Sequence, residues 1–155
     1  MPRPFPHVAA DLPAQHVRSL AAPDFGSPQS LVIDGAPEQV SAARAFVWQV
    51  LGSRHPGAER VALLTSELVT NSVRHSNSRM PGGTVTVTLR VAADRILVEV
   101  VDDGGATAPT LRRDDDLAET GRGLRLVDTY SITWDYHRSA AHTVTWFECL
   151  PEPLS

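Results

Sequence analysis

Glu67 and Asn71 form a pair of polar side chains that suits phosphate chemistry. They lie in the stretch ELVTNSVRHS (67–76), and residues four apart on a helix share one face, with Cβ atoms about 5–6 Å apart. An amide oxygen can be one ligand of Mg²⁺, and a carboxylate can polarise an attacking hydroxyl or water. Because so short a pattern also occurs on ordinary helix surfaces, two solvated side chains are the alternative interpretation.

The stretch VEVVDDGG (98–105) is a second candidate for a site, because an apolar strand ends abruptly there in two aspartates and two glycines. An aspartate at a strand end can accept a hydrogen bond from an exocyclic amine such as that of adenine, and such buried recognition is highly discriminating. Glycines permit a turn and the close approach of a flat ring. The alternative is a polar turn after a strand.

The stretch GRGLRLVD (121–128) is a third candidate, with two glycines at the entry of a predicted short helix. Backbone N–H groups and the positive end of a helix dipole can face an anion there, and Arg122 adds a cation. A helix start with a flexible entry is the alternative. The stretch is neither a Walker motif, since no G-K-[ST] follows, nor a Rossmann fingerprint, since no strand precedes it.

Hydrophobic periodicity predicts the elements that hold these motifs. The predicted elements are, in chain order, a strand over 30–34, helices over 37–51 and 58–75, strands over 84–91 and 95–102, a short helix over 123–130, and strands over 131–138 and 142–150. A loop of about twenty residues precedes the short helix, and loops of that length inside a domain are usually functional or mobile. Clustered strands with helices free to cover one face predict an α+β fold of the two-layer sandwich type.

Composition limits the classes of function. The chain has 155 residues, of which 42% are hydrophobic and 21% charged, which suits a single core. The formal net charge of -4 argues against a generic nucleic-acid binder. No apolar run approaches the roughly 20 residues of a membrane span, so we expect a cytoplasmic protein without a membrane or direct nucleic-acid partner.

The first 28 residues form a predicted flexible tail, and residues 29–151 form the predicted folded domain. The tail is rich in proline, which disfavours helix and removes backbone donors. Its prolines are Pro2, Pro4, Pro6, Pro13, Pro23 and Pro28. A partner-docking arm is the alternative interpretation of this segment.

Several single residues lie outside this pattern. Cys149 is the lone cysteine, so no intramolecular disulfide can form, and its apolar strand predicts an inert buried thiol. Trp134 and Trp146 fall on opposite arms of the last predicted hairpin and could pack as a cross-strand pair. Ser66 and Ser72 flank Glu67 and Asn71, but no His–Asp arrangement supports a nucleophilic serine.

The order of the motifs resembles the GHKL ATPase superfamily with its Bergerat nucleotide-binding fold. The shared features are a helix with E-x-x-x-N, a strand ending in D-x-G, a long loop closing on G-x-G-L, and a late strand with threonine. The chain is most similar to small bacterial anti-sigma-factor serine/threonine kinases, especially the stand-alone actinomycete versions. The resemblance covers about residues 30–150 and implies a mixed, largely antiparallel sheet with helices on one face.

The resemblance assigns roles to the first two motifs. Glu67 would be the general base that activates the acceptor hydroxyl, and Asn71 would hold the Mg²⁺ that bridges the phosphates. Asp102 would accept from the adenine amino group, with Gly104 shaping the pocket floor.

The remaining nucleotide-binding roles fall late in the chain. Gly121 and Gly123 would let the loop and the helix end approach the phosphates, with Arg122 and Leu124 beside them. Thr143 matches the threonine of the last strand that helps to fix adenine through its hydroxyl or a water.

One residue departs from the family pattern. Ala106 stands where the family often has a second glycine, and its methyl group could weaken nucleotide affinity. Residues 110–120 would form the lid over the phosphates. Their acidic triplet (114–116) is more typical of a solvated face than of a metal site.

The function implied by the resemblance is a serine/threonine protein kinase that uses ATP and Mg²⁺. It would transfer the γ-phosphate to an anti-sigma antagonist protein and sequester a sigma factor or a similar regulator, and a homodimer is compatible with the family. The rival hypothesis is an ATP-gated interaction module with little or no kinase activity. A third is an α+β domain that binds no nucleotide.

Overall fold

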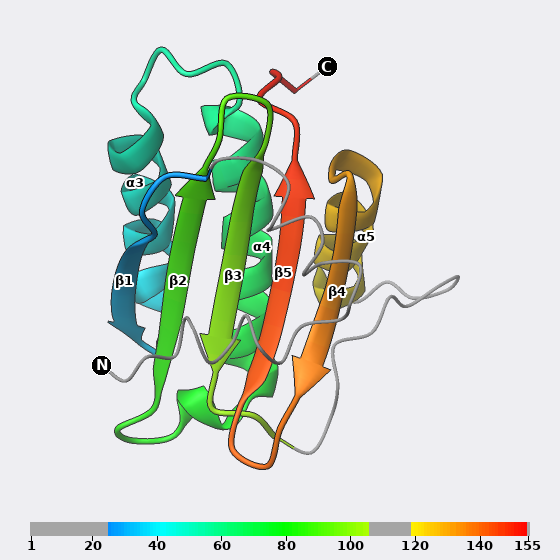
Figure 1. The fold of residues 1–155 in the computed structure, drawn as a ribbon. Helices are drawn as coiled ribbons and strands as arrows, with labels where there is room; N and C mark the ends of the chain where they lie inside the picture. The colour runs from blue at the N-terminus through cyan, green and yellow to red at the C-terminus, as the bar shows by residue number, and fades with distance from the viewer. Residues whose placement is uncertain (1–24, 106–118, 155) are drawn as a thin grey trace.

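A five-stranded sheet is the frame of the molecule (Figure 1). The computed structural model describes residues 25–105 and 119–154, and for residues 119–124 only the backbone. The strands are β1 (Gln29–Asp34), β2 (Thr84–Val91), β3 (Ile96–Asp102), β4 (Thr133–Arg138) and β5 (Thr143–Cys149). Their order in the sheet is β1-β2-β3-β5-β4, and every pair of neighbours is antiparallel.

The helices lie together on one face of this sheet (Figure 1). They are α3 (Val40–Leu51), α4 (Ala58–His75) and α5 (Glu119–Tyr130), with short 3₁₀ turns η1 (Pro37–Gln39) and η2 (Asn77–Arg79). The predicted α+β two-layer sandwich is therefore confirmed. Within the described residues, no helix has the length and apolar character that crossing a membrane requires.

The apolar stripe of α4 anchors the core. Val61, Leu64 and Leu68 are all buried, as the helical periodicity predicts, and they join one cluster with the inward side chains of β2 and β3. The preceding helix, α3, ends at Gly52, whose φ of +92° favours glycine. These contacts fix α4 across the centre of the sheet.

The start of α5 differs from the prediction. The sequence places the helix start at Gly123, but the helix begins at Glu119, so Gly121 and Gly123 lie inside its first two turns. Glycine costs a helix only about 1 kcal/mol relative to alanine, so the helix can include both residues. The predicted lid (110–120) and Ala106 lie largely or wholly outside the described residues, as does most of the predicted tail.

The predicted tryptophan pair is wrong. Trp134 lies opposite Phe147 and packs into the helix-side core, whereas Trp146 lies opposite Asp135 on the other face of the sheet. Side chains alternate between the two faces along a strand, so two residues pack as a pair only if the register places both side chains on the same face. The register was not readable from the hairpin sequence.

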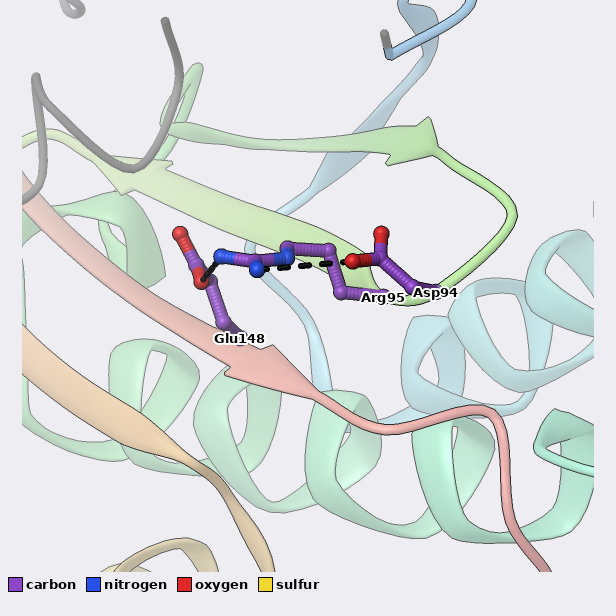
Figure 2. Close-up of polar contacts among 3 residues, drawn as sticks. All are labelled: Asp94, Arg95 and Glu148. Atoms are coloured by element: carbon purple, nitrogen blue, oxygen red, sulfur yellow. Dashed lines mark hydrogen bonds and ion pairs between the residues drawn. The ribbon is translucent and has the colours of Figure 1, made fainter. Parts of the chain in front are cut away.

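The face away from the helices carries its own buried cluster. Its apolar members are Leu97, Val101, Val144 and Trp146, with Phe25 packed against them. At one end of this face, Arg95 contacts the Glu148 carboxylate at 3.3 Å and that of Asp94 at 3.5 Å (Figure 2). The guanidinium compensates the buried charge of Glu148 and ties the turn between β2 and β3 to β5.

Arg60 fastens the beginning of α4 to the end of α5. Its guanidinium donates to the Tyr130 carbonyl at 3.5 Å and to the Pro153 carbonyl at 2.7 Å, and it lies over the Tyr130 ring at 5.5 Å. A cation at a helix C-terminus also interacts favourably with the helix dipole. This single side chain therefore joins three segments that are distant in sequence.

Replacing Arg60 with alanine is expected to lower the free energy of unfolding by about 2 kcal/mol, because charge-assisted hydrogen bonds and packing are lost together. Urea denaturation measures the change. Arg44→Ala, at an exposed position of α3, is the matched control and should stay within about 0.5 kcal/mol of wild type. Equal effects of the two substitutions would contradict this role for Arg60.

Candidate functional site

The Asp102 carboxylate, at the end of β3, is the centre of the candidate site. The residue is only 6% exposed. Its Oδ2 accepts a hydrogen bond from the Ser72 hydroxyl at 2.7 Å, and its Oδ1 accepts from the Gly104 N–H at 2.8 Å. A carboxylate offers about four lone-pair positions, so acceptor capacity remains for a further donor.

The charge state of Asp102 is set by opposing effects. Burial is the largest and raises the pKa of this carboxyl above its ordinary value of 3.8. The hydrogen bonds from Ser72 and from the Gly104 backbone lower the pKa, the neighbouring Asp103 raises it, and His142 lowers it. The ionised form therefore depends on the donors that surround it.

Thr143 lies directly opposite Asp102 in the pairing of β3 with β5, and it is also buried. The turn that follows Asp102 passes close to the turn that precedes Thr143. Gly104 has a φ of +75°, and a Cβ there would lie 3.3 Å from the Ala141 carbonyl oxygen. The structure therefore brings together three of the residues predicted for adenine.

A serine-rich segment fastens α4 to this turn. The Ser78 hydroxyl accepts from the Asp103 N–H at 2.8 Å and donates to the Thr84 carbonyl at 2.6 Å. The Asn77 N–H donates to the Gly104 carbonyl at 2.6 Å, and the Ser76 hydroxyl donates to the Ser72 carbonyl at 2.7 Å. Sequence reasoning gave these hydroxyls no role at the site, although the cluster of small polar residues directly after the helix was visible.

Asn71 and Glu67 lie on α4, within the same part of the fold. Asn71 directly precedes Ser72, Glu67 lies about one turn earlier, and both side chains are half-buried. The helix α5, which contains Gly121 and Gly123 near its beginning, packs against α4. The side chains of Arg122 and Leu124 lie outside the described part of the structure.

Cys149 has the predicted character of an inert thiol. It is buried, and burial raises its pKa to about 12. Among the residues that the structure describes, no group of three His, Cys, Asp or Glu side chains could hold a metal ion.

Comparisons with known proteins identify the family of the chain. The family model described as "Histidine kinase-like ATPase domain" matches residues 33–149. No curated protein matches the chain. The predicted kinship with histidine-kinase-like ATPases is thereby confirmed.

Two solved structures share the fold. The RsbU and RsbW domains of Rv1364c from Mycobacterium tuberculosis align with a TM-score of 0.55 and 17% identity, over 84% of this chain and 35% of that one. The histidine kinase domain of the blue-light activated histidine kinase EL346 from Erythrobacter litoralis aligns with a TM-score of 0.50 and 19% identity, over 74% of this chain and 60% of that one. The chain thus spans about a third and three fifths of their lengths.

Proposed function

We propose that this chain, which belongs to the histidine kinase-like ATPase domain family, binds ATP and transfers its γ-phosphate to a serine or threonine of another protein. The observation that carries the proposal is the buried carboxylate of Asp102, held by Ser72 and Gly104 opposite Thr143. A buried carboxylate needs hydrogen-bond donors, and Ser72 and Gly104 leave lone pairs of Asp102 for a further donor.

Adenine fits the acceptor that Asp102 presents. The exocyclic amine of adenine donates to the remaining lone pairs of the carboxylate, and the Thr143 hydroxyl fixes the ring directly or through a water. A base with an oxygen in place of that amine would set two acceptors against each other. A buried group left without its partner costs about 1–3 kcal/mol, so the arrangement favours ATP.

The phosphates belong at the beginning of α5. Gly121 lies in its first turn, where the backbone N–H groups have no intrahelical partner and the helix dipole is positive, and Gly123 follows in the second turn. An anion is stabilised at such a position, and glycine lets it approach the backbone closely. Arg122 and Leu124 lie beside the phosphates in this proposal.

Asn71 and Glu67 serve the reacting end of the nucleotide. The neutral Asn71 amide fits an ion that keeps most of its ligands from water and phosphate, as Mg²⁺ does. When bound, Mg²⁺ neutralises phosphate charge and orients the γ-phosphate for transfer. Glu67 accepts the proton of the attacking hydroxyl, and it lies about one helical turn from Asn71 on the same face of α4.

The acceptor in this proposal is an antagonist protein, and the sequestered partner is a sigma factor or a similar regulator. The resemblance of the motifs to anti-sigma-factor kinases supports this assignment. Phosphorylation would add nearly two negative charges to the antagonist and break its docking, which frees the kinase to bind the regulator.

A second candidate function is an ATP-gated interaction module without kinase activity. Ala106 favours it, because the family often has glycine at this position and a Cβ narrows the backbone conformations open to a residue. Glu67 argues against it, since binding alone needs no general base. The two candidates differ in phosphate transfer, not in ATP binding.

Calorimetric titration with ATP, with and without Mg²⁺, tests the shared part of both candidates. Wild type is expected to bind ATP more tightly with Mg²⁺, and Asn71→Ala should lose about tenfold in affinity only when Mg²⁺ is present (about 1.4 kcal/mol). Gln49→Ala, an exposed amide on α3, is the control and should bind as wild type does. Absence of binding to millimolar ATP and ADP would refute the proposed function.

A further inference from the structure

Ser72 is the buried hydroxyl that joins α4 to the centre of the candidate site. The residue is 5% exposed, and its Oγ lies 2.7 Å from Asp102 Oδ2, in a contact between residues thirty positions apart. Its partner carboxylate accepts from the Gly104 N–H through the other oxygen. No role in nucleotide binding was predicted for Ser72, which lies directly after Asn71.

The hydroxyl matters because the backbone alone does not fix a carboxylate. The torsion that turns an aspartate carboxyl plane is broad and roughly two-fold, so either oxygen can face the base. With Ser72 holding Oδ2 and the Gly104 N–H holding Oδ1, both oxygens are fixed, and the unused lone pairs point in defined directions.

We propose that Ser72 is a positioning residue that sets the base selectivity of the site. It holds the Asp102 carboxylate as a pure acceptor, so that a 6-aminopurine nucleotide binds and a 6-oxopurine nucleotide is rejected. The inference rests on the proposed function, because it concerns how the same site chooses among nucleotides.

The charges around Asp102 support this role. Burial and the neighbouring Asp103 favour the protonated acid, whereas His142, the Gly104 N–H and the Ser72 hydroxyl favour the carboxylate. Without Ser72 the pKa of Asp102 rises further, and the protonated acid can donate to a 6-oxo group instead of accepting from an amine. Loss of the hydroxyl therefore weakens adenine binding and relaxes selectivity together.

Titration of Ser72→Ala with ATP and with inosine triphosphate tests the inference, since these ligands differ in their 6-amino and 6-oxo groups. We expect ATP affinity to fall about tenfold, with little loss for inosine triphosphate, because a hydrogen bond to a charged group is lost. The loss of ATP binding on acidification should also begin at higher pH in the variant. Ser72→Thr, which keeps a hydroxyl, should restore the preference for ATP.

Ser66→Ala is the matched control, because this buried serine lies on the same helix and donates to the Leu63 carbonyl of that helix. It should leave the preference and the pH profile unchanged. An unchanged preference and pH profile in Ser72→Ala, or an equal change in Ser66→Ala, would overturn the inference. Wild type that binds both triphosphates equally well would overturn it and leave the proposed function standing, whereas wild type that binds neither would overturn both.

Discussion

Glu67→Gln will reduce phosphate transfer from ATP by about a thousandfold, roughly 4 kcal/mol in activation free energy, while the Kd for ATP changes little. The substitution keeps the shape of the side chain and removes its basicity. In the proposed mechanism Glu67 takes the proton from the attacking hydroxyl, and this interaction develops only as the reaction proceeds. An interaction of that kind affects the rate of transfer and leaves the affinity of the ground state unchanged.

Two readouts make this prediction testable. Transfer from [γ-³²P]ATP to purified candidate antagonist proteins measures the proposed reaction, and release of ADP without an acceptor measures attack by water, which needs the same base. Glu59→Gln, at an exposed position in the first turn of α4, is the control for a lost carboxylate on this helix. Equal activity of Glu67→Gln and wild type would remove Glu67 from the mechanism.

The same experiment decides between the two candidate functions. A wild-type chain that binds ATP but transfers no phosphate to any antagonist, and that also leaves ATP unhydrolysed, would be an interaction module. Binding accompanied by transfer that depends on Glu67 would establish the kinase. Affinity for ATP alone does not distinguish the kinase from the interaction module, because both candidates use the same adenine and phosphate contacts.

Local patterns predicted the elements well, because each has a strong period or boundary signal. The predicted limits of α4 are the observed ones, since the stripe through Val61, Leu64 and Leu68 is regular and ends before the small polar residues that follow. The start of α5 was misplaced because glycine was read as a helix boundary, although a helix also accommodates glycine at a cost of about 1 kcal/mol relative to alanine.

The placement of residues in the candidate site was predictable from motifs at strand ends, whereas contacts between residues distant in sequence were not. Asp102 and Thr143 meet as expected, because both lie at the same end of paired strands. No positioning role was predicted for Ser72 or Ser78, because a hydroxyl reveals such a role only when its partner is known, and those partners lie 30 and 25 residues away. Sequence separation of this size leaves no periodic signal.

The second buried face of the sheet was also invisible in the sequence. An antiparallel sheet with helices on one face commonly leaves its other face solvated, and Glu99 lies on that other face. In the structure Glu99 is 1% exposed, between Thr88 of β2 and Trp146 of β5. Its Oε2 has no hydrogen-bond partner among the described residues.

Burial gives Glu99 a measurable effect on stability. Loss of hydration raises the pKa of this carboxyl from 4.5 to about 7, against a smaller opposing effect from Arg90. Since the folded pKa lies above the unfolded value, protonation favours the folded state. The stabilisation is complete below pH 4.5 and is lost as the pH rises through 7, an amount of about 3 kcal/mol if the unfolded carboxyl titrates normally.

Glu99→Gln is therefore expected to stabilise the protein at pH 8 by about 2 kcal/mol, because the variant never carries the buried charge. Burial of a glutamine amide without full hydrogen bonding offsets part of the gain. At pH 5, where Glu99 is already protonated in the folded state, the two proteins should be almost equally stable. Urea denaturation of both proteins from pH 5 to pH 8 measures the difference in their free energies of unfolding. In this difference the contributions of all titratable groups that the two proteins share cancel.

Glu148→Gln provides the contrast, because Glu148 lies on the same face but is paired with Arg95 at 3.3 Å. Its substitution should destabilise the protein at pH 8, since Arg95 loses this carboxylate in a largely buried setting. Opposite signs for two buried glutamates on one sheet face would show that pairing, and not burial alone, decides the outcome. A difference between Glu99→Gln and wild type that stays constant from pH 5 to pH 8 would mean that Glu99 does not titrate in this range, and the assigned burial effect would then be wrong.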